Sequence, residues 1–160
     1  MARQRTATIH RKTNETDISV ELCLDGGEYR IDTGVGFYDH MLDHVARHGR
    51  LGLHVAAKGD THIDDHHTVE DVGIVLGEAL AQALGDKKGI ERFGFASVPM
   101  DEALGRVSLD LSGRSALVFD AAFDDGAGKI GRFDTQLVRE FFTALVNNGK
   151  FNCHVEVVRG

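Results

Sequence analysis

Residues 61–71 place three histidines and four carboxylates beside the start of an apolar helix. From Val69 to Leu84 apolar residues recur at steps of three and four, which predicts a helix. At about 100° per residue, His67 and Glu70 should share one face of this helix while His66 points away. Imidazole nitrogens and carboxylate oxygens are common metal ligands, so the motif predicts one metal position at His67 and Glu70 and another at His66. The alternative is a helix cap exposed to solvent, because Asp64, Asp65 and Thr68 are all residue types that can cap a helix N-terminus.

A second group of histidines lies in a helix that we expect over residues 37–48. His40, His44 and His48 stand at i, i+4 and i+8, so their imidazoles should form a ridge along one side. His40 is the better candidate ligand because it lies near the helix start beside Asp39. For His44 and His48 an ordinary surface ridge is the alternative. The residues that we expect on the buried side are Phe37, Met41, Leu42 and Val45.

Composition narrows the class of protein. The 160 residues contain 42% hydrophobic residues, enough for one sizeable core in a single domain. The net charge of −7 gives no electrostatic footprint for nucleic acid or for an anionic membrane, and favours a small-molecule partner. Cys23 and Cys153 are isolated in the sequence, so we expect buried thiols in a reducing compartment rather than a disulfide. No apolar run is long enough to span a bilayer and residues 1–5 lead into no signal-peptide core, so we expect a cytoplasmic protein.

Alternating polarity and turn residues predict the strands of the first half. Residues 5–11 and 18–24 should form a hairpin, followed by a strand over 29–33 and, after the helix, a strand over 51–55.

The second half repeats this pattern. Strands are predicted over residues 107–111 and 116–120, a helix should end near residue 147, residues 131–137 resemble 36–42, and residues 150–155 resemble 50–55. We therefore expect an α+β fold of two tandem strand-strand-strand-helix-strand-helix units, about 1–90 and 91–160, with sheets packed on helices. The second unit lacks its last helix within the 160 residues.

These motifs together resemble those of the imidazoleglycerol-phosphate dehydratases, along the whole chain. The resemblance rests on Arg-Lys-Thr-Asn-Glu-Thr at 11–16, Phe-Tyr-Asp-His-Met-Leu at 37–42, the histidine motif at 62–71, Lys-Gly-Ile-Glu-Arg-Phe-Gly at 88–94 and Asp-Leu-Ser-Gly-Arg at 110–114. It implies a hydro-lyase that converts imidazoleglycerol phosphate to imidazoleacetol phosphate and water in histidine biosynthesis. A metal-dependent hydrolase would use similar ligands, but the sequence has no His-Glu-x-x-His arrangement.

The resemblance also implies two manganese ions. His40, His67 and Glu70 would bind one ion and His66 the other. Glu140 falls where the family often places a histidine ligand to the second metal. Manganese accepts mixed nitrogen and oxygen ligands, although these ligand types would also suit zinc or iron.

Further roles follow from the same resemblance. Glu15 matches the general base, which is otherwise an ordinary solvated carboxylate in a turn. Arg92 and Arg114 match arginines that hold the substrate phosphate, a role that suits a planar guanidinium; the alternative is a surface ion pair. His48 matches a position near the substrate.

One departure from the family concerns the end of the sequence. Family members carry a second His-His-x-x-Glu helix after the strand that ends here near Val158, with a lysine for the phosphate, and that helix completes both metal sites. The 160 residues include neither, so we expect these residues alone to bind manganese weakly and to form a smaller, inactive assembly. An alternative function is therefore a truncated, inactive subunit or assembly intermediate. The family assembles as twenty-four subunits with active sites between neighbours, which implies a homo-oligomer here, a trimer or, with the C-terminal helix, a 24-mer.

Overall fold

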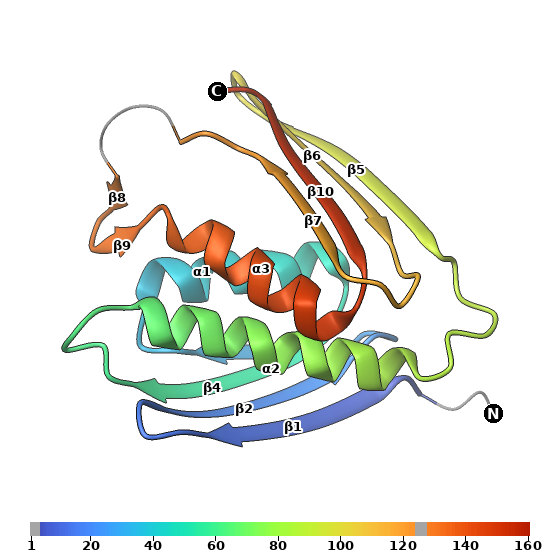
Figure 1. The fold of residues 1–160 in the computed structure, drawn as a ribbon, viewed down its shortest axis with the longest axis horizontal. Coiled ribbons are helices and arrows are strands. Elements are labelled where there is room, and N and C mark those ends of the chain that lie inside the picture. The colour runs from blue at the N-terminus through green and yellow to red at the C-terminus, as the bar shows by residue number, and fades with distance from the viewer. Residues whose placement is uncertain (1–3, 124–127) are drawn as a thin grey trace.

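Two four-stranded sheets enclose a layer of helices in the computed structural model, which describes residues 4–123 and 128–160 (Figure 1). Part of the N-terminal segment considered above, residues 1–3, therefore lies outside the described residues. The first sheet has the order β1 (Thr6–Lys12), β2 (Thr16–Cys23), β4 (Gly52–Gly59), β3 (Tyr29–Asp32). In it β1, β2 and β4 pair antiparallel, whereas β3 runs parallel to β4.

The second sheet repeats this arrangement. Its order is β5 (Phe93–Met100), β6 (Ala103–Asp110), β10 (Asn152–Arg159), β7 (Ala116–Asp120), with β7 parallel to β10 and the other pairs antiparallel. The two sheets thus share strand order and direction, which confirms the predicted duplication and the α+β class. A small hairpin of β8 (Lys129–Ile130) and β9 (Phe133–Asp134) stands before the helix of the second unit.

Three helices fill the space between the sheets: α1 (Gly36–Gly49), α2 (His66–Leu84) and α3 (Leu137–Gly149). α2 lies across β1, β2 and β4 and also packs along α3, which contacts β7. The apolar positions of α2 that sequence spacing selected are mostly buried, among them Val69, Val72 and Val75. They pack in one core with the inward side chains of β2 and β4, such as Ile18 and Leu53. This packing fixes the start of α2, where the histidine motif lies.

The contact between α2 and α3 depends on two glycines. A methyl group at Gly73 would lie 2.9 Å from Cβ of Ala144, and one at Gly77 would lie 2.6 Å from the carbonyl oxygen of Leu145. Any side chain at these positions would push the helices apart, because real Cβ atoms do not approach so closely. The two glycines therefore set the close approach of the two units.

The buried side of α1 differs from the prediction. Tyr38, Leu42 and Ala46 are buried, whereas Met41 and Val45 are exposed by 44% and 46%. The buried stripe follows i, i+4 and i+8 from Tyr38, because the ring of Tyr38 packs against Phe133 and Phe141 of the second unit. The sequence spacing identified the helix but placed its buried face incorrectly at these two positions.

Several boundaries also differ from the predictions. The strand expected over 51–55 continues to Gly59. The first strand of the second unit is β5, which the repeat implies but for which no range was predicted. The segment resembling 36–42 contains β9 before the helix begins at Leu137. Both cysteines are free, as predicted; Cys153 is buried and Cys23 is partly exposed. None of the helices in the described residues is long and apolar enough to cross a membrane.

Candidate active site

The histidine motif lies where β4 leads into α2. Asp65 occupies the N-cap position, but its side chain does not cap the helix; Oδ1 instead accepts a hydrogen bond from Nη2 of Arg132 at 3.2 Å. Oδ1 of Asp64 accepts the backbone N–H of His66 at 2.8 Å. The loop is therefore held by two carboxylates, and Arg132 connects it to the second unit.

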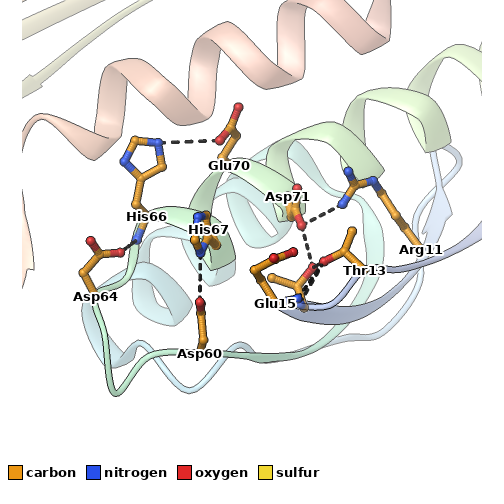
Figure 2. A network of polar contacts seen from close by, with 10 residues as sticks. Arg11, Thr13, Glu15, Asp60, Asp64, His66, His67, Glu70 and Asp71 are labelled. Atoms are coloured by element: carbon orange, nitrogen blue, oxygen red, sulfur yellow. Dashed lines mark hydrogen bonds and ion pairs between the residues drawn. The ribbon is translucent and has the colours of Figure 1, made fainter.

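His66 and Glu70 form a pair on the first turn of α2. Nε2 of His66 lies 3.5 Å from Oε2 of Glu70, and both side chains are about half exposed (Figure 2). The sequence predicted instead that His66 points away from Glu70. Residues at i and i+4 lie one above the other on a helix, so Glu70 brings its carboxylate to the ring of His66.

His67 is oriented by a carboxylate that sequence reasoning missed. Nδ1 of His67 lies 2.9 Å from Oδ2 of Asp60, at the end of β4. In the neutral ring this contact makes Nδ1 the protonated nitrogen and leaves Nε2 free to bind a cation. The hydrogen bond that His67 donates to Asp60 is the main cause that raises the pKa of His67, with smaller charge effects from Asp60, Glu15 and Asp64. The only sequence signal for this pair was that Asp60 stands seven residues before His67, after a predicted strand.

Glu15 lies in the turn between β1 and β2, beside this face of α2 (Figure 2). The turn is closed by Thr13, whose Oγ1 accepts the backbone N–H of Glu15 at 3.1 Å and of Thr16 at 3.0 Å. The Glu15 side chain is exposed, and its charge contributes to the raised pKa of His67. The structure thus brings Glu15 and His67 to the same side of the first unit.

The predicted histidine ridge forms on the exposed side of α1. Nε2 of His44 lies 3.1 Å from Nε2 of His40, and Nε2 of His48 lies 3.2 Å from Nδ1 of His44. The His44 and His48 rings are stacked at a centroid distance of 5.3 Å. The three imidazoles therefore form a continuous row, with His44 linking the two residues to which roles were assigned.

The two candidate phosphate arginines lie close to one carboxylate at the end of β6. Arg92 precedes β5 and donates to Asp110 from Nε and Nη2, and Arg114 stands in the turn between β6 and β7. Hydrogen bonding from Arg92 is the largest cause that lowers the pKa of Asp110, and the charge of Arg114 adds to it. The structure therefore brings Arg92 and Arg114 together.

These arginines and Glu15 lie at opposite ends of α2. The Glu15 turn lies beside the first turn of the helix, whereas a methyl group at Gly113, next to Arg114, would lie 3.8 Å from Nζ of Lys87, just beyond the helix C-terminus. Nineteen helical residues span roughly 28 Å. Within one chain, Glu15 therefore lies far from Arg92 and Arg114.

The predicted metal ligands do not all converge within the chain. Glu140 lies in the first turn of α3 and lines a hollow with Phe119 and Arg139. Within residues 4–123 and 128–160, no three His, Cys, Asp or Glu side chains are placed to hold one metal ion. The donor chemistry nevertheless fits a divalent cation. With metal–ligand bonds of about 2.0–2.2 Å, the His66–Glu70 separation needs little adjustment for both to bind one ion, and Asp60 leaves Nε2 of His67 available.

Comparisons with known proteins agree on one family. The family model described as imidazoleglycerol-phosphate dehydratase matches residues 33–160. Curated imidazoleglycerol-phosphate dehydratases from Streptococcus mutans and Dinoroseobacter shibae are 60% and 59% identical over 157 residues, which are 98% of this chain and 80% of each relative. The crystal structure of the dehydratase from Staphylococcus aureus superposes with a TM-score of 0.86 at 40% identity, covering 97% of this chain and 85% of that one. That from Pyrococcus furiosus gives 0.82 at 35% identity, covering 95% and 80%.

Proposed function

Since the chain belongs to the imidazoleglycerol-phosphate dehydratase family, whose members dehydrate imidazoleglycerol phosphate in histidine biosynthesis, we propose that Glu15 is the general base of this reaction. The observation that supports this role is the position of the Glu15 turn beside the histidine face of α2. An exposed carboxylate here can reach a substrate whose imidazole ring is held at that face. The site would thus unite a proton acceptor with metal ligands.

The reaction removes a weakly acidic C–H proton and a hydroxide next to the imidazole ring. We propose that the carboxylate of Glu15 accepts the C–H proton and that this proton balances the departing hydroxide, so that the C–H and C–O bonds break, one water leaves and the resulting enol rearranges to the ketone. Asp60 fixes the ring of His67, and His66 and Glu70 present their donor atoms from the same helix turn. When bound, divalent cations supply electrostatic stabilisation for the negative charge that develops on the substrate ring.

We propose manganese as the cation and His40, His66, His67, Glu70 and Glu140 as ligands from this chain. Mixed imidazole and carboxylate donors suit manganese in octahedral sites. Because the described residues place no three such ligands together, we propose that neighbouring subunits complete each site.

The same reasoning applies to the phosphate. We propose that Arg92 and Arg114 of one subunit bind the phosphate of a substrate that reacts at Glu15 of another. The separation of the two groups along α2 supports this arrangement. The protein would therefore work as a homo-oligomer with shared active sites, with His48 near the substrate.

Glu15→Gln, made in an enzyme that also carries the family's C-terminal helix, tests the proposed base. It removes the proton acceptor without removing a ligand, so kcat should fall at least about 100-fold, within the range that general bases contribute. Metal content and substrate Kd should stay close to those of the unaltered enzyme. Glu21→Gln, an exposed glutamate on β2, is the matched control and should leave kcat unchanged. Near-normal turnover of Glu15→Gln would exclude Glu15 as the base.

A further inference from the structure

We propose that Asp71 is a positioning residue that holds the Glu15 turn against the start of α2 through the hydroxyl of Thr16. This inference rests on the proposed role of Glu15 as the base. Asp71 directly follows Glu70, and Thr16 directly follows Glu15, so one contact joins the two chain segments that carry the base and a metal ligand.

The contact is short and buried. Thr16 Oγ1 donates a hydrogen bond to Asp71 Oδ2 at 2.5 Å, and the exposed fractions of the two residues are 3% and 9%. Nη1 of Arg11, on β1, lies 2.6 Å from the same oxygen, as an ion pair without the alignment of a hydrogen bond. The carboxylate thus has a positive partner and a hydroxyl donor. Such partners offset the cost of removing a carboxylate from water.

The hydrogen bond of Thr16 fixes the direction of a longer chain. Because Thr16 uses its only hydroxyl proton on Asp71, the 3.2 Å contact with Thr13 Oγ1 requires Thr13 to be the donor. Thr13 also accepts the backbone N–H groups of Glu15 and Thr16. A single line of hydrogen bonds therefore runs from the backbone of the Glu15 turn to the carboxylate on α2.

This line explains why a charged residue stands at a buried position of α2. The next residue along the helix, Val72, is buried in the core. An apolar residue at position 71 could also be buried, without the free-energy cost of desolvating a charge. An apolar residue could not fix the hydroxyl of Thr16. The arrangement restricts where the exposed Glu15 carboxylate can lie relative to Glu70 and His67, and such restriction is what orientation contributes to catalysis.

Thr16→Val and Thr16→Ser are the matched test. Valine keeps the shape of threonine but lacks the hydroxyl, so kcat for imidazoleglycerol phosphate should fall about 10- to 100-fold. KM should change less than about threefold, because Thr16 touches no substrate. Serine keeps the hydroxyl and should restore kcat to within about threefold of the unaltered enzyme. In Asp71→Asn the amide oxygen can still accept the hydrogen bond from Thr16, but the negative charge that pairs with Arg11 is gone. Its kcat should therefore fall between those of Thr16→Ser and Thr16→Val.

The controls separate positioning from general damage. Asp25→Asn breaks another Asp–Arg pair, with Arg5, at the far end of the same hairpin and should leave kcat unchanged. Metal content and assembly size of Thr16→Val should also be unchanged. If Thr16→Val does not fold, Thr16→Ser and Asp71→Asn are compared instead. The inference requires a higher kcat in Thr16→Ser than in Asp71→Asn.

Three outcomes would overturn the inference. If Glu15→Gln is inactive but Thr16→Val retains normal kcat, or if serine loses as much kcat as valine, Asp71 does not position the base. If Glu15→Gln itself retains normal turnover, the proposed function of Glu15 is wrong, and the inference falls with it.

Discussion

Arg92 donates two hydrogen bonds to the carboxylate of Asp110, from Nε to Oδ1 at 2.5 Å and from Nη2 to Oδ2 at 3.0 Å. This pairing fixes the plane of the guanidinium before any substrate arrives, and it leaves Nη1 and one proton of Nη2 for another acceptor. Arg92 also lowers the pKa of Asp110 below its ordinary value of 3.8. The pair therefore contributes to stability above that pH, and its contribution is lost as the pH falls through the lowered pKa.

Arg92→Lys should weaken binding of phosphate-bearing substrates selectively. Lysine keeps the positive charge but cannot make the planar two-point contact, so the Kd of imidazoleglycerol phosphate should rise about 10-fold. Binding of the unphosphorylated imidazole glycerol should change less than about twofold. Titration calorimetry with both compounds measures this difference. Equal losses for the two ligands would mean that Arg92 has only a structural role.

Two inactive variants should restore activity when they share one assembly. Glu15→Gln lacks the proposed base and Arg92→Ala lacks a proposed phosphate-binding group, and these groups lie at opposite ends of α2. If each active site takes them from different subunits, subunits mixed during reassembly will form some sites with both groups intact. Mixed samples should recover at least about a tenth of normal turnover, since about a quarter of randomly paired sites are intact. No recovery in confirmed mixed assemblies would contradict shared active sites.

Cys153 should resist alkylation in the folded protein. Burial raises the pKa of its thiol from 9.0 to about 11, which lowers the thiolate fraction about 100-fold near pH 8. Iodoacetamide should therefore label the partly exposed Cys23 first, as mass spectrometry of the labelled peptides would show. The protonated thiol favours the fold below pH 9.0, and that contribution is lost as the pH rises toward 11. Rapid labelling of native Cys153 at pH 8 would contradict its burial.

Gly77→Ala should destabilise the protein although alanine is the better helix former. Alanine gains about 1 kcal/mol in helix propensity, but its methyl group would lie 2.6 Å from the carbonyl oxygen of Leu145. Overpacking of this kind costs about 1–3 kcal/mol net, so the Tm should fall by roughly 2–10 °C. Gly36→Ala, at the open start of α1, is the matched control and should not lower the Tm. Calorimetry of both variants tests the close contact between the helices.

Sequence periodicity predicted most of the fold because most elements carry a strong pattern. Besides the short β8 and β9, the exception was β5, whose segment contains Gly94 and Pro99 and does not alternate cleanly. Proline cannot donate to a strand ladder, so it weakens any prediction of a strand. The structure accommodates Pro99 because β5 is the edge strand of its sheet. Pro99 is acceptable in β5 only because of the position of this strand within the sheet. The sequence does not reveal that position, so the strand was not predicted.

The candidate site was predictable only in part, for a similar reason. The ligand types of His66, His67 and Glu70 stand together in the sequence, and the family resemblance supplied Glu15. Asp60 and Asp71 acquire their roles through contacts with His67 and with Thr16, which lies 55 residues before Asp71 in the chain. No local pattern distinguishes such carboxylates from solvated ones, because their partners are set by tertiary packing.

The glycine contact between α2 and α3 also bears on how the chain folds during synthesis. All four strands of the first sheet and both of its helices are complete by Leu84, before the ribosome has made any strand of the second unit. The first unit can therefore close early, as N-terminal units generally do. Its α2 then offers the flat strip at Gly73 and Gly77 as a template on which the later α3 docks. Synthesis order thus makes the α2 side of this contact available before the residues of α3 exist.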